Sequence, residues 1–416
     1  MSESYTRSKY HLLVVGNIVL FLNGMAIFCV NPVFPSKGME HGLSKVQIGL
    51  LMAVSNYFAS MGGPLSAKFG SYISVMASYN IGAILMGLSI GCFGWIDLLS
   101  SNTNVFFTWV LLLRAATGVA ESLILISMMT KIMDTFPNQR GLVIGTSETS
   151  LASGLIFGSA LSIQLVSKFT FYLPYLIIGS LHLIMIPIAN CFASRAQREY
   201  VKLDSDTRMV PIGTLLTKPL VMLPIISNFF ANFALGSLYA LTEYRAQQLD
   251  LSPTIYTTFF VIYGLTTLIF RPLGGMCCDA DPPTPIYWNL FFDSGGIIGF
   301  LLIGPISQLW DGGRDWFFIS STVFFGLLNC CLIATCSRAQ NGVGLSGLPM
   351  NEKISQRVQS LWATLFFLGL GMGSHVSGYL ISVMSFNNIM ITNAAIALVA
   401  FFIDLFALCI STKGRT

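Results

Sequence analysis

Long apolar segments recur along almost the whole chain, and they restrict its possible folds more than any other feature. Each is close to the roughly 20 apolar residues that one helical crossing of a bilayer core needs. Only 10% of the 416 residues are charged, whereas soluble domains carry about 25%. We therefore expect an all-α membrane protein with twelve transmembrane helices. The expected spans cover residues 12–30, 46–63, 72–94, 105–130, 142–166, 172–193, 219–241, 255–275, 286–309, 316–336, 358–383 and 388–411.

The first apolar run is interrupted by Asn17 and Asn23 and lacks a small-residue cleavage site. We interpret it as the first span after a short cytosolic tail, rather than as a signal peptide. The nine cysteines lie in or beside apolar runs without metal-ligand spacing, so we expect packing roles and neither a metal nor a cofactor. The net charge of +4 is scattered, which offers no basic face for nucleic acid.

The longest polar stretch, residues 194–218, falls between the sixth and seventh runs and predicts a cytosolic linker. It divides the chain into an N-terminal six-helix bundle, residues 1–193, and a C-terminal six-helix bundle, residues 219–416. A repeat supports this division, because two dipeptides at the ends of the second span recur 208 positions later at the ends of the eighth. Two pseudo-symmetric bundles place a substrate site at the membrane midplane. The repeated pairs are Leu43-Ser44 with Leu251-Ser252, and Pro64-Leu65 with Pro272-Leu273.

Basic residues are concentrated in the segments that share a side with the N-terminus. Because cytosolic segments carry the excess of Lys and Arg, we expect both termini to be cytosolic. Lys131, Arg271 and Arg338 are assigned to these cytosolic segments, and Arg245 to an outer one.

Three motifs follow a pattern shared by one class of transporters. Arg114 to Gly118 on the fourth span resembles an Arg-x-x-x-Gly motif. Pro272 to Asp279 resembles the Gly-x-x-x-Asp motif that follows the eighth span, with Gly275 and Asp279 in its key positions. The corresponding Gly63 to Gly70 in the first half is shortened and lacks the Asp.

These motifs make the chain resemble the major facilitator superfamily, and within it the polyamine-transporter-like branch of the vesicular amine transporter family. The resemblance is strongest over residues 114–158. It implies proton antiport of an amine, gating by Gly275 and Asp279, and a vesicular or plasma-membrane location. Ser159 and Ser374 replace prolines of the family pattern, and the first span lacks the acidic residue of monoamine carriers.

Buried ionisable residues are the candidates for binding substrate or protons, since each costs at least about 2.5–3.5 kcal/mol in hydrocarbon. Arg114 and Glu121 lie two turns apart on one face of the fourth span. Glu148 lies about one turn into the fifth span, an antiparallel neighbour. We hypothesise that Arg114 pairs with Glu148 or an anion, while Glu121 binds a cation or a proton. An Arg–Glu pair that only fixes helix packing is the alternative.

Asp293, in the ninth span, is a candidate cation ligand or the cap of a helix break at the following glycines. For Asp404 we expect a structural or snorkelling role. His182 and His375 fit packing roles better than titration. Five tyrosines could bind an organic cation through their ring faces. They are Tyr57, Tyr239, Tyr244, Tyr256 and Tyr263.

Three functions remain open. The first is a proton-coupled antiporter of a small organic cation such as an amine or polyamine, acting as a monomer in the lipid bilayer. The second is a carrier of an anionic or zwitterionic solute that faces Arg114. The third is a non-transporting scaffold or receptor. No catalytic motif predicts an enzyme, and no repeated filter segment predicts a channel.

Overall fold

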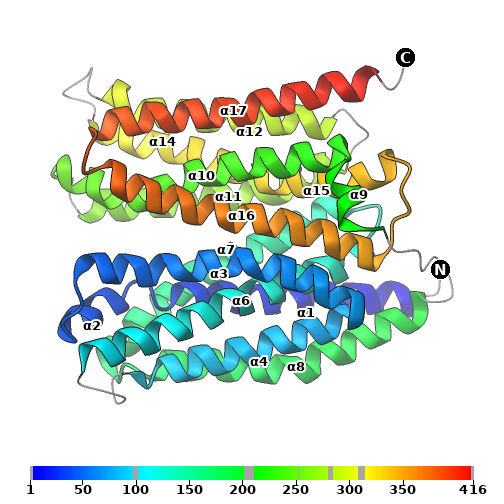
Figure 1. Cartoon of the computed structure of the whole chain (residues 1–416), viewed down its shortest axis with the longest axis horizontal. Coiled ribbons are helices and arrows are strands. Elements are labelled where there is room, and N and C mark those ends of the chain that lie inside the picture. The colour runs from blue at the N-terminus through cyan, green and yellow to red at the C-terminus, as the bar shows by residue number, and fades with distance from the viewer. Residues whose placement is uncertain are drawn as a thin grey trace. The chain divides into compact units, whose positions relative to one another are not determined.

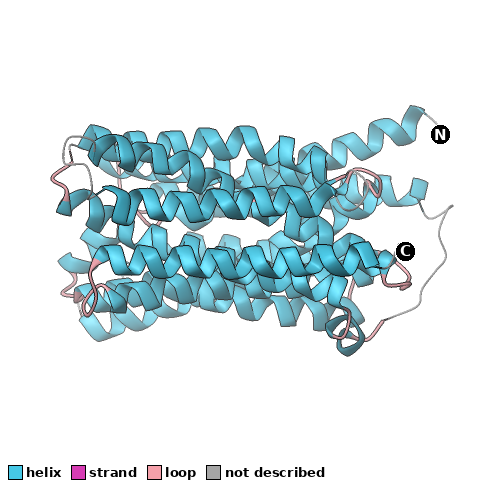
Figure 2. Cartoon of the chain, turned by 90° about the horizontal axis from the view of Figure 1, so that it is seen from above, coloured by secondary structure: helices cyan, strands magenta, loops and turns pink. Residues whose placement is uncertain are grey.

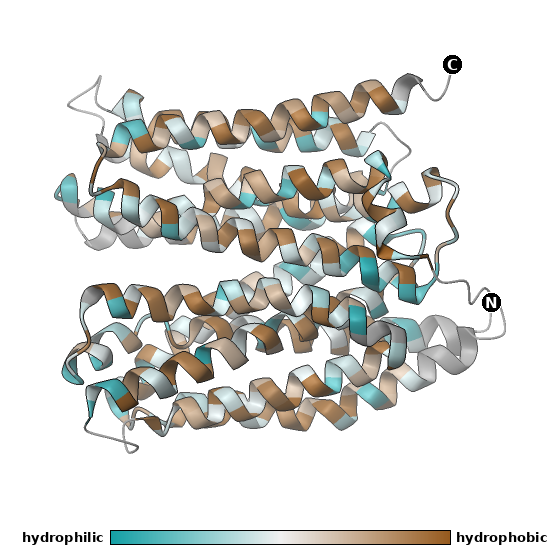
Figure 3. Ribbon diagram, viewed as in Figure 1, coloured by the Kyte–Doolittle hydropathy of each residue, from teal (hydrophilic) through white to brown (hydrophobic). Residues whose placement is uncertain are grey.

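A computed structural model describes residues 3–96, 102–200, 210–251, 253–279, 284–307 and 314–413. Throughout these ranges the chain is helical, with short turns and no strand, as Figure 2 shows. Apolar residues cover most of the length of the helices, and hydrophilic residues are more frequent near the helix ends (Figure 3). The all-helical fold class predicted from the apolar runs is confirmed.

The helices of the first half match the six predicted runs and add one short helix after the first. Their bounds are α1 (Glu3–Phe28), α2 (Phe34–Glu40), α3 (Lys45–Tyr72), α4 (Val75–Phe93), α6 (Thr103–Thr135), α7 (Arg140–Lys168) and α8 (Leu173–Tyr200). Several begin at recognisable caps: Ser74 accepts a hydrogen bond from the Ala77 N–H at the start of α4, and the Asn102 side chain caps α6.

The second half likewise matches its six runs, but two of them are interrupted. The ninth run becomes α12 followed by a π-helical turn, where non-helical Gly304 precedes Pro305. The tenth run breaks at Cys330 into two helices. The bounds are α9 (Ile212–Leu216), α10 (Pro219–Gln248), α11 (Pro253–Cys278), α12 (Thr284–Leu301), η1 (Leu302–Ile306), α14 (Arg314–Asn329), α15 (Cys331–Leu345), α16 (Glu352–Leu380) and α17 (Phe386–Lys413).

Ten candidate membrane spans are long and apolar enough among the described residues. The predicted second and eleventh spans, α3 and α16, are more polar and are not among the ten. Part of the predicted linker, residues 201–209, lies outside the described ranges.

The chain divides into two compact units. The first contains Met1–Pro137, Thr146–Met209 and Pro349–Thr364. In it α6 packs on α1, α3 and α4, and α8 packs on α1 and α4 (Figure 1). The second contains Asn138–Gly145, Val210–Leu348 and Leu365–Thr416. There α17 packs on α10 and α12, and α14 packs on α11 and α12.

Glycines allow one helix pair in each unit to approach very closely. In the first unit, a Cβ on Gly154 of α7 would lie 1.9 Å from the carbonyl oxygen of Phe21 on α1. In the second, a Cβ on Gly373 of α16 would lie 1.9 Å from the carbonyl oxygen of Phe233 on α10. Only glycine fits such contacts, which are typical of tightly packed membrane helices.

The serines that replace the family's prolines strengthen the same two helix pairs. Ser374 Oγ on α16 donates to the Gly236 carbonyl oxygen on α10 at 2.9 Å. Ser159 Oγ on α7 donates to the Phe28 carbonyl oxygen on α1 at 3.4 Å. Phe28 and Gly236 are separated by the same 208 positions as the repeated dipeptides, so the repeat is visible in the helix contacts.

Candidate functional site

Arg114 is buried on α6 and is held mainly by α3. Its Nη2 donates to Ser55 Oγ at 2.8 Å and to the Met52 carbonyl oxygen at 3.4 Å. Its Nε donates to the Leu51 carbonyl oxygen at 3.4 Å. The Nη1 atom has no partner within the described ranges, so its N–H groups remain available to donate hydrogen bonds.

Glu121 lies two turns further along α6 and is 5% exposed. Its Oε2 atom is buried and accepts no hydrogen bond from any described residue. Asn23 of α1 donates to the Glu121 carbonyl oxygen at 3.4 Å, and the Asn23 Oδ1 atom is also buried without a described partner. The contact between α1 and α6 at Glu121 therefore has two acceptor oxygens without described partners, Glu121 Oε2 and Asn23 Oδ1. Arg114 is the charged group that acts on Glu121.

The hypothesised pair between Arg114 and Glu148 is not seen. The hydrogen bonds of Arg114 go to α3, and its electrostatic neighbours are Glu121, Cys29 and Tyr175. Glu148 is buried on α7 at 2% exposure and has interactions of its own. The short α6–α7 connection made the two helices neighbours in sequence, but it did not fix which residues on their faces meet.

A second polar group forms in the other unit around two of the predicted tyrosines. The hydroxyls of Tyr239 on α10 and Tyr263 on α11 are hydrogen-bonded, and their rings meet edge-on at a centroid distance of 6.1 Å. Asn329 at the end of α14 donates to the Tyr263 hydroxyl. Arg271 Nη2 donates to Asn329 Oδ1 at 3.0 Å. The group combines ring faces with a fixed cation.

Asn329 and Arg271 were not predicted to join the group around Tyr239 and Tyr263. Arg271 was assigned to a cytosolic segment, although it lies inside α11 and is 5% exposed. The side chain of Tyr256 falls outside those that the structure describes. Tyr244 is 44% exposed and does not join the group.

Asp279, predicted as a gating residue, caps the start of α7. Its carboxylate accepts the N–H of Gly141 at 2.5 Å and that of Leu142 at 2.8 Å. Burial raises the pKa of the Asp279 carboxyl, and these two N–H groups together with Arg140 lower it in part. Gly275 lies against the same segment, since its Cβ would come within 2.3 Å of the Gly141 carbonyl oxygen. Asp279 and Gly275 thus form one seam between α11 and α7.

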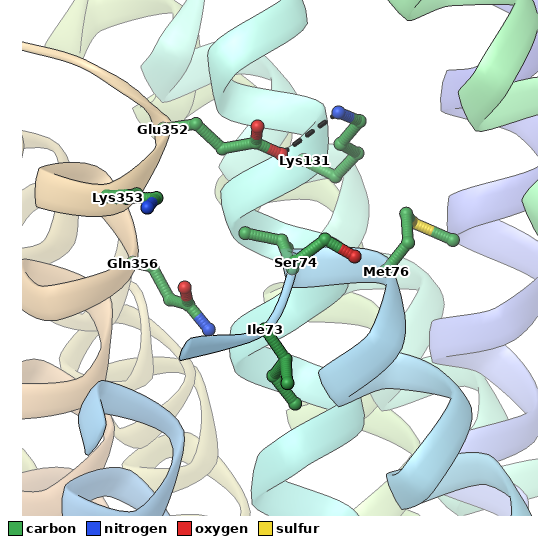
Figure 4. Close-up of a pocket in the computed structure, with 8 residues that line it drawn as sticks. Ile73, Ser74, Met76, Lys131, Glu352, Lys353 and Gln356 are labelled. Atoms are coloured by element: carbon green, nitrogen blue, oxygen red, sulfur yellow. Dashed lines mark hydrogen bonds and ion pairs between the residues drawn. The ribbon is translucent and has the colours of Figure 1, made fainter. Parts of the chain in front are cut away.

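The first half lacks the corresponding Asp, and a different contact holds the start of α16. Lys131 Nζ on α6 forms an ion pair with Glu352 Oε1 at 2.9 Å, which we call the Lys131–Glu352 latch. One turn further, Gln356 donates to Ser66 Oγ on α3 at 3.2 Å. Lys131, Glu352 and Gln356 border a cavity of about 250 Å³, and Figure 4 shows the ion pair at this cavity.

Four basic residues are more buried than the charge pattern predicted. Lys131, Arg271 and Arg338 lie within helices and are at most 8% exposed, so they are not loop residues. Arg245, expected near the outer surface, is 2% exposed and donates to Ser307 Oγ at 2.8 Å. Each forms a hydrogen bond or an ion pair with a residue of its own unit. Each therefore either joins helices or is part of a candidate site.

Asp404 is fully buried and paired with Arg338, so the snorkelling role is wrong. Asp293 is also fully buried, in the continuous helix α12 rather than at a break. His182 is a packing residue whose Nδ1 is 3.0 Å from the Ile178 carbonyl oxygen. No group of three or more potential metal ligands occurs in the described part of the chain.

Comparisons with known proteins agree with this architecture. The profile of the Major Facilitator Superfamily matches residues 17–348. The MFS-type transporter SLC18B1 of Homo sapiens is 22% identical over 385 residues, covering 92% of this chain and 82% of that protein. An uncharacterized transporter of Buchnera aphidicola is 23% identical over 373 residues, covering 87% and 83%. The proton:xylose symporter XylE has the same fold, with a TM-score of 0.76 at 12% identity over 97% of this chain and 96% of XylE.

Proposed function

Because the chain belongs to the major facilitator superfamily, we propose that this multi-pass membrane transporter exchanges a small organic cation for protons. An amine or polyamine is the substrate class that fits best. The protein acts as a monomer with both termini in the cytosol, in a vesicular or plasma membrane. Two pseudo-symmetric bundles rock around the substrate, which gives alternating access.

The unpaired acceptors at Glu121 and Asn23 carry this proposal. Buried polar atoms almost always have hydrogen-bond partners, so the free Glu121 Oε2 and Asn23 Oδ1 atoms call for a donor. A protonated amine supplies several N–H donors and a positive charge. It would satisfy both oxygens and neutralise the carboxylate.

Coupling to protons follows from the chemistry of the same carboxylate. A proton on Glu121 removes the charge that attracts the amine, and a bound amine excludes the proton. Binding of one therefore releases the other, which is the physical requirement of antiport. Arg114, whose hydrogen bonds go to α3, limits how strongly Glu121 holds either cation. Glu148, buried in the same unit, is a further candidate contact.

Two contacts at helix starts fit a gate that must open and close. The Asp279 cap releases or engages the start of α7. The Lys131–Glu352 latch does the same for the start of α16. Each relies on hydrogen bonds or an ion pair and not on large apolar contacts, so each can break at moderate cost during the cycle.

A zwitterionic substrate is the second candidate, and Arg114 supports it. The Nη1 atom of Arg114 lacks a partner in the described part of the molecule. A substrate with a carboxylate and an ammonium group could bind Arg114 and Glu121 together. An anionic solute would use Arg114 alone.

Counterflow in proteoliposomes separates these possibilities. Vesicles loaded with an unlabelled polyamine, monoamine, amino acid or carboxylate are given the labelled compound outside. We expect exchange of amines, and a loss of roughly tenfold or more in Glu121→Gln because a charge-assisted hydrogen bond of about 1.5–3 kcal/mol is removed.

Glu40→Gln is the matched control, since Glu40 is an exposed carboxylate paired with Lys37. Exchange of amino acids or carboxylates without amines would support the second candidate. Absence of exchange for all four classes would contradict both and favour a scaffold or receptor.

A further inference from the structure

A second buried charged cluster lies where α12, α15 and α17 meet. It contains Asp293 of α12, Arg338 of α15 and Asp404 of α17, which are 0%, 8% and 0% exposed. Figure 1 shows α12 beside α17. All three helices belong to the second unit, and none of these residues takes part in the Glu121 group.

The hydrogen bonds within the cluster are unevenly distributed. Asp404 accepts from Arg338 Nη1 through one oxygen, and from Ser227 Oγ at 2.8 Å and Asn289 Nδ2 through the other. Asp293 accepts only from Cys331 Sγ, at 3.0 Å to Oδ1. Its Oδ2 atom is buried and unpaired among the described residues.

Asp293 lies one helical turn from Asn289 on α12, and the Asn289 side chain donates to Asp404, so the two carboxyl groups are neighbours in this cluster. Two ionised carboxylates and one guanidinium would leave a net charge of −1 inside apolar helices, which is strongly unfavourable. One proton removes this charge. Asp404 already accepts hydrogen bonds from Arg338, Ser227 and Asn289, whereas Asp293 Oδ2 accepts none from the described residues. The proton is therefore placed on Asp293 Oδ2, where its O–H can donate to Asp404.

The charged and titratable groups that face Asp293 come from two helices. Asp404 faces it from α17, and Arg338 and Cys331 face it from α15. The other elements packed on α12, namely α11, α14 and η1, present no charged group to Asp293 in the residues that are described. The protonation of Asp293 therefore depends mainly on its carboxylate neighbour.

The corresponding helix pair in the first half is joined by neutral side chains. There Asn80 of α4 and Asn190 of α8 are hydrogen-bonded through their amides, with Asn190 Nδ2 2.6 Å from Asn80 Oδ1. The α4–α8 pair corresponds to the α12–α17 pair in the repeat, where Asn289 and Asp404 meet. The first-half pair therefore carries a neutral polar contact where the second-half pair carries charged groups.

We propose that Asp293 and Asp404 form a proton-binding site whose proton is taken up and released in each transport cycle. In the loaded state the Asp293 O–H donates to the Asp404 carboxylate. Release breaks that O–H bond, leaves its electron pair on Asp293 and passes the proton to a water molecule. The resulting net charge of −1 makes this the high-energy state of the cluster, so it favours rapid proton uptake. This assignment rests on the proposed proton-coupled function and adds a site distant in sequence from Glu121.

Infrared spectroscopy of the purified protein in lipid tests proton binding without any transport. The wild type is expected to show the carbonyl band of a buried carboxylic acid that disappears as the pH is raised. Buried Glu121 contributes a band of its own, so the diagnostic signal is the component that Asp293→Asn removes. Asp404→Asn is expected to remove the same component, because Asp293 then ionises to pair with Arg338. Ser227→Ala is the control: it removes one hydrogen bond to Asp404 but no titratable group, and it should keep the band. An unchanged band in both Asn variants would overturn the site.

Transport assays test coupling separately. In proteoliposomes, Asp293→Asn is expected to keep amine exchange at equal pH and to lose accumulation driven by a pH gradient. Full gradient-driven accumulation in Asp293→Asn would overturn the coupling role. If the wild type exchanges no substrate, the proposed function fails, whereas the infrared band still decides whether the proton site exists.

Discussion

Replacing Glu352 by Gln removes the negative charge of the Lys131–Glu352 latch and nearly preserves the size of the side chain. The side chains are 5% and 28% exposed, and their charged atoms are 2.9 Å apart. Exposed pairs contribute about 0–1 kcal/mol, and breaking a buried pair costs about 3–5 kcal/mol. This pair lies between those limits, so we expect a loss of about 1–3 kcal/mol. That loss corresponds to a roughly 5–150-fold larger population of the state in which the start of α16 is detached from Lys131.

Hydrogen–deuterium exchange in nanodiscs measures this population at the first turns of α16, because amides there exchange when the segment opens. We expect faster exchange over residues 352–364 in Glu352→Gln. Lys353→Gln is the matched control, since Lys353 is an exposed charge on the same turn. Adding Lys131→Met to Glu352→Gln should change little further, because the pair is already broken. Equal exchange in wild type, Glu352→Gln and Lys353→Gln would refute the latch.

Three further predictions concern other contacts. Asp279→Ala removes both acceptors of the α7 cap and should speed amide exchange over residues 140–145 more than Asp279→Asn; equal rates would contradict the cap. Gly154→Leu should lower the free energy of unfolding by about 3 kcal/mol or more, because the larger side chain overpacks the contact. Gly49→Leu, at a position with open space around it, should be near neutral. Equal melting temperatures of the two variants would count against the α1–α7 contact. Arg338→Leu and Asp404→Leu should each cost about 3–5 kcal/mol and their combination much less than the sum, as measured by unfolding in detergent; strict additivity would argue against a pair.

The apolar runs predicted the helices because helix length and hydropathy are local properties. Every expected span has a matching helix. The ninth span breaks at Gly304 and not at the glycines after Asp293, and the break in the tenth span was not expected. The break at Cys330 directly follows Asn329, whose side chain donates to the Tyr263 hydroxyl of another helix. Hydropathy carries no information on such a contact.

The candidate sites were predicted less completely because they depend on which helix faces meet. Glu121 and Asp293 were identified as costly buried charges, which a single sequence can indicate. The groups around a buried charge come from far along the chain. Arg338 and Asp404, which form the ion pair beside Asp293, are 66 positions apart. Arg338 lies two residues beyond the expected tenth span, residues 316–336. A predicted span that was two residues longer would have included it as a buried cation.

Proton movement driven by substrate tests the proposed antiport most directly. Proteoliposomes with a pH-sensitive dye inside are given an external polyamine, which is charged at neutral pH and crosses lipid slowly. We expect the interior to become more alkaline as labelled polyamine enters, faster than in protein-free vesicles, and we expect no such change in Glu121→Gln. Polyamine uptake by the wild type with no change in interior pH would contradict proton antiport.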